Sequence, residues 1–535
     1  MRDQNRPANN SGQPTDERPT NEQTTSRRQL LQGLAATASA GAVLSLGSTT
    51  AAAYHERLDR YSEEFGTVID VVEAGADDTG TESVVDVIRE YRDDDTLLVF
   101  PPGEYYMDEQ VRFTGFEKFG LAGDDATLVP ADYFDFDGPN YRLFRLGVNY
   151  SPGDRLVFDN FDVDQTAPDT GIRVLDTVVT DGLEVRDITV RGQHDSGTWG
   201  PGRFNIADPN GTGIVERFEA PDGGAWVDET PNDGNLWRGP SGLIANGNSG
   251  TLRFADCTLG GFPDNGLYAS GGSGKIVVDG GLYKNSNGAV VRIGGEGSVV
   301  RNATIEVDQN RPQDVSHRGI RLERGSYLRV DNVTVRNSEP MPNSFGISVM
   351  NSCRWARVDD SVVRISGDEV DHGIVVSPSA GKVKLINTGI ELNTPGGFGV
   401  YLHGNDDAGE GVCNYLDITG DAGDKTAAAG IRCDRDDVRF GKTSVDQPGG
   451  EKRRAIVNTG DDVKFWQGVY RATEHPIIDL GTGTWVEEIY AKSYSDTEAI
   501  RLYDQSADVY LKNNTLRGGI RDDGSAGLKT VGNEF

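Results

Sequence analysis

The sequence predicts an all-β solenoid, because short apolar segments recur at a regular interval along most of the chain. In each segment, apolar residues alternate with other residues, and once per segment two residues stand where strict alternation allows one. The segments return about every 21 to 30 residues, which fits one coil of a repeat protein and is too short for a self-contained domain. The alternation indicates strands, and the interruption indicates a turn. The clearest segments begin at Val185, Phe254, Val278, Val300, Val330, Val358 and Leu385.

The turn inside each coil is predicted at an Asn or Asp residue. Both residue types tolerate left-handed backbone angles and form hydrogen bonds with neighbouring backbone groups. Stacked from coil to coil, such side chains would form a ladder. The predicted turn residues are Asn160, Asp187, Asp256, Asn302, Asn332, Asp360, Asn387 and Asn513.

A third strand in each coil is predicted from a second pattern, Gly-apolar-x-apolar. It occurs at Gly266, Gly319, Gly346, Gly373, Gly399 and Gly430. Each coil therefore contains three short strands whose apolar residues face a common core. For one coil, the predicted core residues are Val330, Val333, Val335, Ile347 and Val349.

With three strands per coil, the chain resembles the right-handed parallel β-helix proteins of the pectin-lyase-like superfamily over about residues 65–535. Gly-Ala-Asp-Asp-Thr-Gly at 75–80 and Leu-Leu-Val-Phe-Pro-Pro-Gly-Glu-Tyr-Tyr at 97–106 are similar to the start of the pectate-lyase-3 type members. The resemblance implies a short helix, capped by Thr81 and with Glu82 in its first turn, that covers the N-terminal end of the core. It implies no single function, because this scaffold carries lyases, hydrolases, esterases and non-catalytic surface proteins.

These patterns divide the chain into three regions. Residues 1–53 form a polar N-terminus and a signal segment, and residues 54–96 form the N-terminal cap. Residues 97–535 form the parallel β-helix, with an insertion at about 193–241.

The signal segment resembles a twin-arginine export signal. Arg27 and Arg28 precede a weakly apolar stretch of Ala, Gly and Leu that ends at an Ala-x-Ala cleavage pattern near residue 53. An uncleaved membrane anchor is the alternative, but three glycines in the stretch and its modest hydropathy disfavour a stable span. We therefore expect a secreted or cell-surface protein without a membrane span in its mature form.

The charge balance excludes two classes of partner. The chain has 84 Asp and Glu against 52 Lys and Arg, for a formal charge of −32. The negative electrostatic field of a protein with this charge repels nucleic acid and anionic membrane surfaces. An excess of carboxylates with few lysines resembles the surfaces of proteins from halophilic archaea, where a Debye length of about 3 Å at molar salt screens self-repulsion.

The predicted insertion is rich in aromatic residues, which argues for order in a segment too long for an ordinary loop. Trp199 and Trp237 are candidates for stacking on sugar rings, and Tyr268 and Tyr401 on outward strand positions are further candidates. The alternative is that the tryptophans pack the insertion onto the flank of the β-helix.

Candidate catalytic residues gather at one edge of the coils between residues 298 and 411, where three of the six histidines fall. Adjacent coils lie about 4.8 Å apart, so outward residues of neighbouring coils form columns. The column two residues after the glycine of the third strand reads Tyr268, Val290, Arg321, Ser348, Val375 and Tyr401, and no column holds a glycosidase-like carboxylate pair. The alternative to a catalytic role is that each of these residues lies in a turn and is in contact with solvent. The candidate catalytic residues are His317, Arg318, Arg321, Glu323, Asp371, His372 and His403.

Two classes of function follow from these residues. The first is an exported polysaccharide-active enzyme, a lyase or a glycoside hydrolase, acting in a groove on the flank of the β-helix. Pectate lyases of this fold use an Arg or Lys base with calcium, and the resemblance implies Asp368 and Glu369 as calcium ligands. The second class is a non-catalytic cell-surface or carbohydrate-binding protein. In either case the expected partner is a polysaccharide, and we expect the side chains of Arg321, Asp371 and His372 to point outward.

Overall fold

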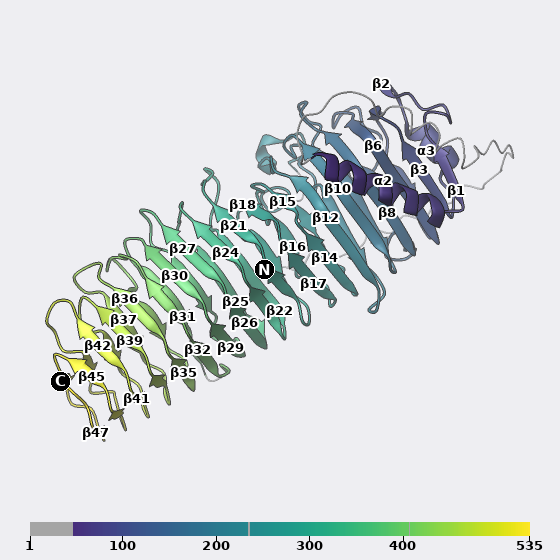
Figure 1. Ribbon diagram of the computed structural model, residues 1–535. Helices are drawn as coiled ribbons and strands as arrows, with labels where there is room; N and C mark the ends of the chain where they lie inside the picture. The colour runs from purple at the N-terminus through teal and green to yellow at the C-terminus, as the bar shows by residue number, and fades with distance from the viewer. Residues whose placement is uncertain (1–46, 234–235, 406) are drawn as a thin grey trace.

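The computed structural model describes residues 47–233, 236–405 and 407–535, and it shows a right-handed parallel β-helix with three sheets. Figure 1 shows the coils stacked side by side along one axis, from β1 near one end to β47 at the other. The all-β prediction is confirmed: the described helices are α2 (Gly47–Glu64), α3 (Val85–Tyr91) and a short 3-10 turn at Val227–Glu229. The predicted signal residues Arg27 and Arg28 lie outside the described residues.

Two of the sheets meet at the predicted turn and share hydrogen bonds as one 31-stranded sheet. Sheet 1 holds the strands before the turn: β1 (Thr67–Asp70), β3 (Thr96–Phe100), β14 (Thr251–Ala255), β17 (Lys275–Asp279), β20 (Val299–Arg301), β23 (Leu328–Asp331), β26 (Trp355–Asp359), β29 (Lys382–Ile386), β32 (Gly411–Asn414), β35 (Val438–Gly441), β38 (Lys464–Trp466), β41 (Trp485–Glu487), β44 (Tyr510–Lys512) and β47 (Lys529–Val531). Sheet 2 holds those after it: β2 (Thr79–Ser83), β4 (Gly103–Met107), β15 (Thr258–Leu259), β18 (Leu282–Lys284), β21 (Thr304–Val307), β24 (Thr334–Asn337), β27 (Val362–Ser366), β30 (Gly389–Asn393), β33 (Asp417–Thr419), β36 (Ser444–Gln447), β39 (Val469–Ala472), β42 (Tyr490–Ser493) and β45 (Thr515–Arg517). Four long strands run through both sheets: β6 (Lys118–Pro130), β8 (Arg155–Asp164), β10 (Leu183–Arg191) and β12 (Thr212–Ala220).

Sheet 3 has 16 strands and contains the predicted glycine pattern. Its strands are β5 (Val111–Phe113), β7 (Arg142–Leu146), β9 (Arg173–Val179), β11 (Gly202–Ile206), β13 (Leu243–Ile244), β16 (Leu267–Ala269), β19 (Val291–Ile293), β22 (Arg318–Gly325), β25 (Phe345–Cys353), β28 (His372–Val376), β31 (Gly397–Leu402), β34 (Ala428–Cys433), β37 (Arg454–Asn458), β40 (Ile477–Asp479), β43 (Ile500–Leu502) and β46 (Ile520–Asp522). Parallel pairing in register stacks Ile320, Ile347 and Ile374 on one another inside the core.

The predicted turn and core residues are confirmed. All eight predicted turn residues have positive φ, between 46° and 63°. Part of the expected side-chain ladder forms, since Asn332 Nδ2 donates to Asn302 Oδ1 at 2.9 Å and Asn302 Nδ2 donates to Asp279 Oδ1 at 2.8 Å. The five core residues predicted for one coil are all buried.

Helix α2 lies on the outer face of the first coils (Figure 1). Tyr54, Leu58, Tyr61 and Phe65 form a small apolar cluster with outward residues of β3, β6 and β8. Arg57 Nε pairs with Asp159 Oδ2 at 2.8 Å at the rim of this cluster. Apolar burial and ion pairing together fix α2 on sheet 1.

The helix predicted near Thr81 begins later, at Val85. Residues Thr79–Ser83 form β2 instead, because the Asp77 carboxylate accepts hydrogen bonds from the backbone N–H groups of Thr81 at 2.7 Å and Glu82 at 2.8 Å. Val85 and Ile88 of α3 contribute to the main core.

The prediction of one continuous insertion at 193–241 is wrong. A complete pair of strands, β11 and β12, lies within it, and only the two connections to sheet 3 around that pair are long. The sequence pattern failed here because Gly and Pro residues interrupt the apolar alternation. Across the described part of the chain, no helix has the length and hydropathy to cross a membrane.

Candidate polysaccharide-binding surface

A row of aromatic and basic side chains follows the edge of sheet 3, where each strand begins. Register pairs Arg318 with Phe345 and Phe345 with His372 on successive coils. The Arg318 guanidinium lies over the Phe345 ring, 5.5 Å from its centroid. His372 stacks against Phe345 at 5.8 Å and against Phe398 at 5.3 Å. These side chains therefore form a continuous row along the axis of the β-helix.

Three arginines lie near one carboxylate beside this row, and two of them contact it. Arg321 Nε contacts Glu323 Oε2 at 2.5 Å, and Arg292 Nε lies 3.3 Å from the same oxygen. Arg318 forms no ion pair within the described part of the chain, and its Nε is buried without a hydrogen-bond partner. Burial alone would raise the pKa of Glu323, but hydrogen bonding by Arg321 and the charge of Arg292 lower it below its usual value. The cluster therefore carries an excess of positive charge.

The predicted column two residues after the glycine needs one correction. Arg292, not Val290, pairs with Tyr268 and Arg321, because β16, β19 and β22 align Leu267 with Val291 and Ile320. The alignment shifts the sequence-based register by two residues in this coil. The Arg292 guanidinium lies 4.6 Å from the centroid of the Tyr268 ring. Tyr401 in β31 lies on the same outer face of sheet 3 as the arginines.

Two predicted catalytic residues, His317 and Asp371, are buried and do not point outward. The His317 ring lies 3.1 Å from the carbonyl of Ser286 and 3.0 Å from the amide oxygen of Asn310, so it fixes the loop before β22. The Asp371 carboxylate accepts hydrogen bonds from Asn337 Nδ2 at 2.8 Å and the His372 backbone N–H at 2.6 Å. Burial raises the pKa of Asp371 to about 8. Both side chains lie inside a corner of the coil, away from the outer face.

His372 is held as a neutral hydrogen-bond donor. Burial, followed by the charges of His403 and Arg453, lowers the pKa of His372 to about 4. Its Nδ1 accepts the backbone N–H of Phe398 at 2.9 Å, which places the remaining ring proton on Nε2. At neutral pH His372 can therefore donate through Nε2, but it cannot accept a proton there.

His403 differs from the other histidines of this region. Its ring stacks on Tyr401 at a centroid distance of 3.5 Å, and neither ring nitrogen has a hydrogen-bond partner in the described part of the chain. Burial lowers the pKa of His403. The Tyr401 hydroxyl donates to Asp434 Oδ2 at 3.0 Å. Among the predicted residues, His403 is thus the one with a free, neutral imidazole.

The predicted stacking tryptophans are both exposed. Trp199 is 50% exposed and Trp237 is 61% exposed. The connection that carries Trp237 is tied to the loop before β22, because Arg238 Nη1 donates to the carbonyl of Gln313 at 2.6 Å. These loops stand at the edge of sheet 3 where Arg318 lies.

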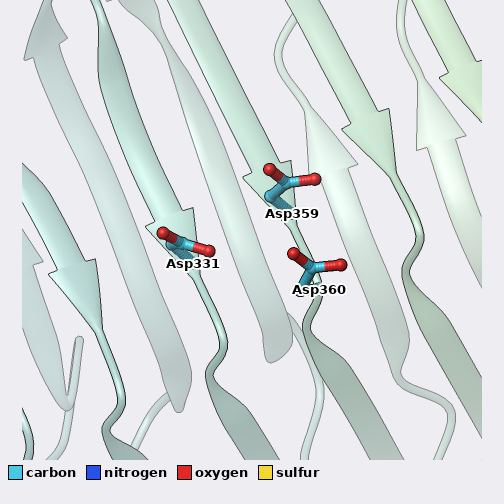
Figure 2. A group of neighbouring side chains, drawn as sticks. All are labelled: Asp331, Asp359 and Asp360. Carbon is cyan, nitrogen blue, oxygen red and sulfur yellow. The ribbon is translucent and has the colours of Figure 1, made fainter.

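The predicted calcium ligands do not fit a metal site. Asp368 and Glu369 are exposed, and neither belongs to a group of three Asp, Glu, His or Cys ligands among the described residues. A group of that kind occurs elsewhere, where Asp331, Asp359 and Asp360 approach one another on sheet 1 (Figure 2). The sequence did not single it out, because its members belong to two coils.

Comparison with known proteins supports the fold. A family model described as the right-handed β-helix region matches residues 239–408. The chain is similar to the surface protein and adhesin PfbA of Streptococcus pneumoniae at 9% identity over 87% of this chain and 100% of that chain, with a TM-score of 0.33. It is also similar to the A-module of mannuronan C-5 epimerase AlgE4 from Azotobacter vinelandii (11%, 86% and 96%, TM-score 0.28) and to DFA-IIIase from Arthrobacter chlorophenolicus A6 without its lid (12%, 86% and 98%, TM-score 0.28). A search among curated proteins found no match.

Proposed function

We propose that the protein binds an acidic polysaccharide along the outer face of sheet 3. The observation that carries this proposal is the cluster of Arg292, Arg318 and Arg321, of which Arg292 and Arg321 pair with Glu323, beside an aromatic row. In a chain of net charge −32, a local excess of guanidinium groups attracts anions to one place. Guanidinium groups bind carboxylates through paired, charge-assisted hydrogen bonds.

The geometry of the row favours a polymer over a small anion. Coils repeat at about 4.8 Å, so a chain that lies along the axis meets a new strand edge at each coil. The rings of Phe345, His372 and Phe398 offer a flat apolar surface for sugar faces, while the arginines bind carboxylates on one side.

A second candidate function is cleavage of that polysaccharide by β-elimination. The observation that favours it is His403, a neutral imidazole with free ring nitrogens next to Tyr401. In such a reaction, a base removes the proton next to a uronate carboxylate while a cation neutralises that carboxylate. Beside His403 that cation is Arg432, which is in register with Tyr401, because Arg321 lies three coils away. The bond to the glycosidic oxygen then breaks as a carbon–carbon double bond forms, and the departing oxygen takes up a proton from the imidazolium or from water. Glycoside hydrolysis is less well supported, because the described residues of this row contain no pair of facing carboxylates.

Export remains part of the proposal. The twin-arginine pattern at Arg27 and Arg28 would deliver the folded β-helix to the cell surface or the medium. There it would meet polysaccharides that do not enter the cytoplasm.

Calorimetric titration with short oligogalacturonates tests the binding function. Arg318→Ala combined with Arg321→Ala should remove one bound oligosaccharide per chain, because charge-assisted hydrogen bonds contribute about 1.5 to 3 kcal/mol each. A matched control, Lys492→Ala with Arg517→Ala, removes the same charge from exposed positions of sheet 2 and should leave the stoichiometry unchanged. Unchanged binding by the first pair would refute the assignment of sheet 3.

The same preparations test the β-elimination candidate. Polygalacturonate is incubated with the parent protein and with His403→Ala, and ultraviolet absorbance of unsaturated product is followed together with reducing ends. Unsaturated product from the parent, and at least about a hundredfold less from the variant, supports a lyase with His403 as base. Binding without either signal identifies a non-catalytic carbohydrate-binding protein.

A further inference from the structure

A short motif, aromatic-x-Arg-x-Asp, occurs in register on two neighbouring strands of sheet 1. It reads Tyr327-Leu-Arg-Val-Asp331 at β23 and Trp355-Ala-Arg-Val-Asp359 at β26. The register pairs Arg329 with Arg357 and Asp331 with Asp359. The intervening residues are buried in the core, so the motif residues face outward. Three matched pairs of side chains therefore lie side by side on the outer face of sheet 1, away from the sheet 3 surface.

These side chains line a hollow of about 380 Å³. The rings of Tyr327 and Trp355 lie 5.3 Å apart at an angle of 39°, and Tyr327 is 60% exposed. Exposed aromatic rings at the rim of a hollow provide the flat apolar faces that pyranose rings stack on. The aromatic pair gives the hollow one apolar side, and the arginines and aspartates give it a polar side.

Two aspartates at or beside the hollow, Asp359 and Asp360, are engaged by protein groups, whereas no side-chain partner of Asp331 occurs among the described residues. Asp359 Oδ2 pairs with Arg357 Nη2 at 2.5 Å, and Asp360 Oδ1 accepts a hydrogen bond from Asn387 Nδ2 at 2.5 Å. Figure 2 shows Asp331 at the end of one strand, facing Asp359 and Asp360 on the next coil. Asp331 thus offers oxygens that can accept hydrogen bonds from sugar hydroxyl groups.

The arginine column continues along the axis as a row of cations. In the register of sheet 1, Arg357 is followed on successive coils by Lys384, Val412, Arg439 and Lys464. None of Arg329, Lys384, Arg439 and Lys464 forms an ion pair with another described residue. From Arg329 to Lys464 the row spans five coil steps, or about 24 Å. A row of cations without ion pairs attracts an external anion, although the Glu410 carboxylate lies within electrostatic range of Lys384 and Arg439.

We propose that this face of sheet 1 is a second binding site, for an anionic glycan that lies along the axis. One sugar ring stacks on Tyr327 and Trp355, Asp331 accepts its hydroxyl groups, and Arg329 and Lys384 bind the carboxylate or sulfate groups. The occupant is a glycan rather than a bare polyanion, because the aromatic pair and Asp331 would have no role with one. The site does not depend on the sheet 3 proposal, because the two sheets share no side chain in these arguments.

The test uses the full-length chain carrying Arg318→Ala and Arg321→Ala, so that the sheet 3 surface is disabled. Binding is measured by affinity electrophoresis in gels that contain polygalacturonate, dextran sulfate or neutral dextran. Two variants are added to this background: Arg329→Ala with Lys384→Ala, and Tyr327→Asn with Trp355→Ala. Asn is chosen because residue 327 has a φ of 57°, which Asn tolerates. The control pair is Lys492→Ala with Arg517→Ala.

The background protein should be retarded by at least one of the two anionic polymers and not by dextran. Each of the two added variants should weaken that retardation at least about tenfold in apparent affinity, as expected for lost cation and ring contacts. The control pair should change it by less than about twofold. Retardation by polygalacturonate or by dextran sulfate identifies the carboxylated or the sulfated glycan as the ligand class.

The inference is overturned if the background protein binds neither anionic polymer, or if both added variants bind as the control does. Thermal unfolding of each variant shows whether the coil remains folded. If the ring variant unfolds early, the cation variant, whose side chains are solvated, decides the result. If the background protein, which carries only Arg318→Ala and Arg321→Ala, no longer binds an anionic polymer that the parent binds, the sheet 1 site is refuted and the sheet 3 proposal stands.

Discussion

Replacing Arg435 by Met tests how the turns between coils are held together. Arg435 is among the largest fully buried side chains of the described residues. Burial lowers the pKa of its guanidinium, and no carboxylate among the described residues pairs with it. Its nitrogens donate instead to four backbone carbonyls at 2.9 to 3.1 Å, those of Ser377, Gly381, His403 and Gly409.

The expected loss of stability follows from these four bonds. Met fills most of the volume of the arginine stem but donates no hydrogen bond, so the carbonyls of three successive coils lose their partner. At about 1 kcal/mol for each lost bond, the cost is about 4 kcal/mol. Relief from burying an unpaired charge offsets part of this cost, which leaves about 2 to 4 kcal/mol of lost unfolding free energy. Arg435→Lys should fall between the variant and the parent, because an ammonium group has three donors.

Urea unfolding followed by far-ultraviolet circular dichroism measures the effect. Arg517→Met is the matched control, because Arg517 is exposed and forms no ion pair in the described part of the chain. The His403 carbonyl is one of the four acceptors, so Arg435→Met should also weaken any activity that depends on His403. An unfolding midpoint equal to that of the parent would show that the buried arginine does not hold these turns.

Three further predictions concern the core, the pH dependence and export. Val333→Asp places an unpaired charge in the core and should reduce the unfolding free energy by several kcal/mol; a parent-like melting curve would show that the coil register is wrong. Because burial raises the folded-state pKa of Asp371 to about 8 from an unfolded value near 4, the folded state holds the proton between these values, and stability should fall as pH rises from about 4 to about 8. Asp371→Asn should flatten that part of the stability profile, and an unchanged slope in thermal melts at pH 5 and pH 8 would contradict the assignment. Arg27→Lys with Arg28→Lys should leave the precursor in the cytoplasm, as judged by fractionation, and normal secretion would dismiss the twin-arginine route.

The coil architecture could be predicted from the sequence because it depends on local, repeated requirements. A left-handed turn admits few residue types, so Asn332 and Asp360 mark their coils wherever the neighbouring strands lie. The alternation of Val330, Val333 and Val335 fixes which side chains face the core. The same logic placed Arg321, Ser348 and Tyr401 in one column, since equivalent positions in successive coils share a face.

The predictions that failed concern residues whose position depends on how loops pack over the strands. Asp371 stands in the column next to His372, but a corner loop buries it, and no periodic pattern records that loop. The shift from Val290 to Arg292 arose because a glycine in that coil lies two residues out of step with Gly266. The cation row on sheet 1 was missed because Arg329 and Lys384 lie 55 positions apart in sequence and become neighbours only through the coil register.

The one-dimensional stacking of coils gives a bound polymer a mechanical role. Each coil contacts mainly the coils before and after it, so thermal opening of one part of the stack is opposed only by its immediate neighbours. A glycan that spans several coils would contact coils that do not touch one another. Because it would bind the folded stack and not the unfolded chain, it would stabilise the folded state. Such a ligand acts as a splint. The stabilisation should increase with the number of sugar units until the polymer is longer than the cation row. At a given ligand concentration, the length of the ligand would therefore determine how rigid the stack becomes.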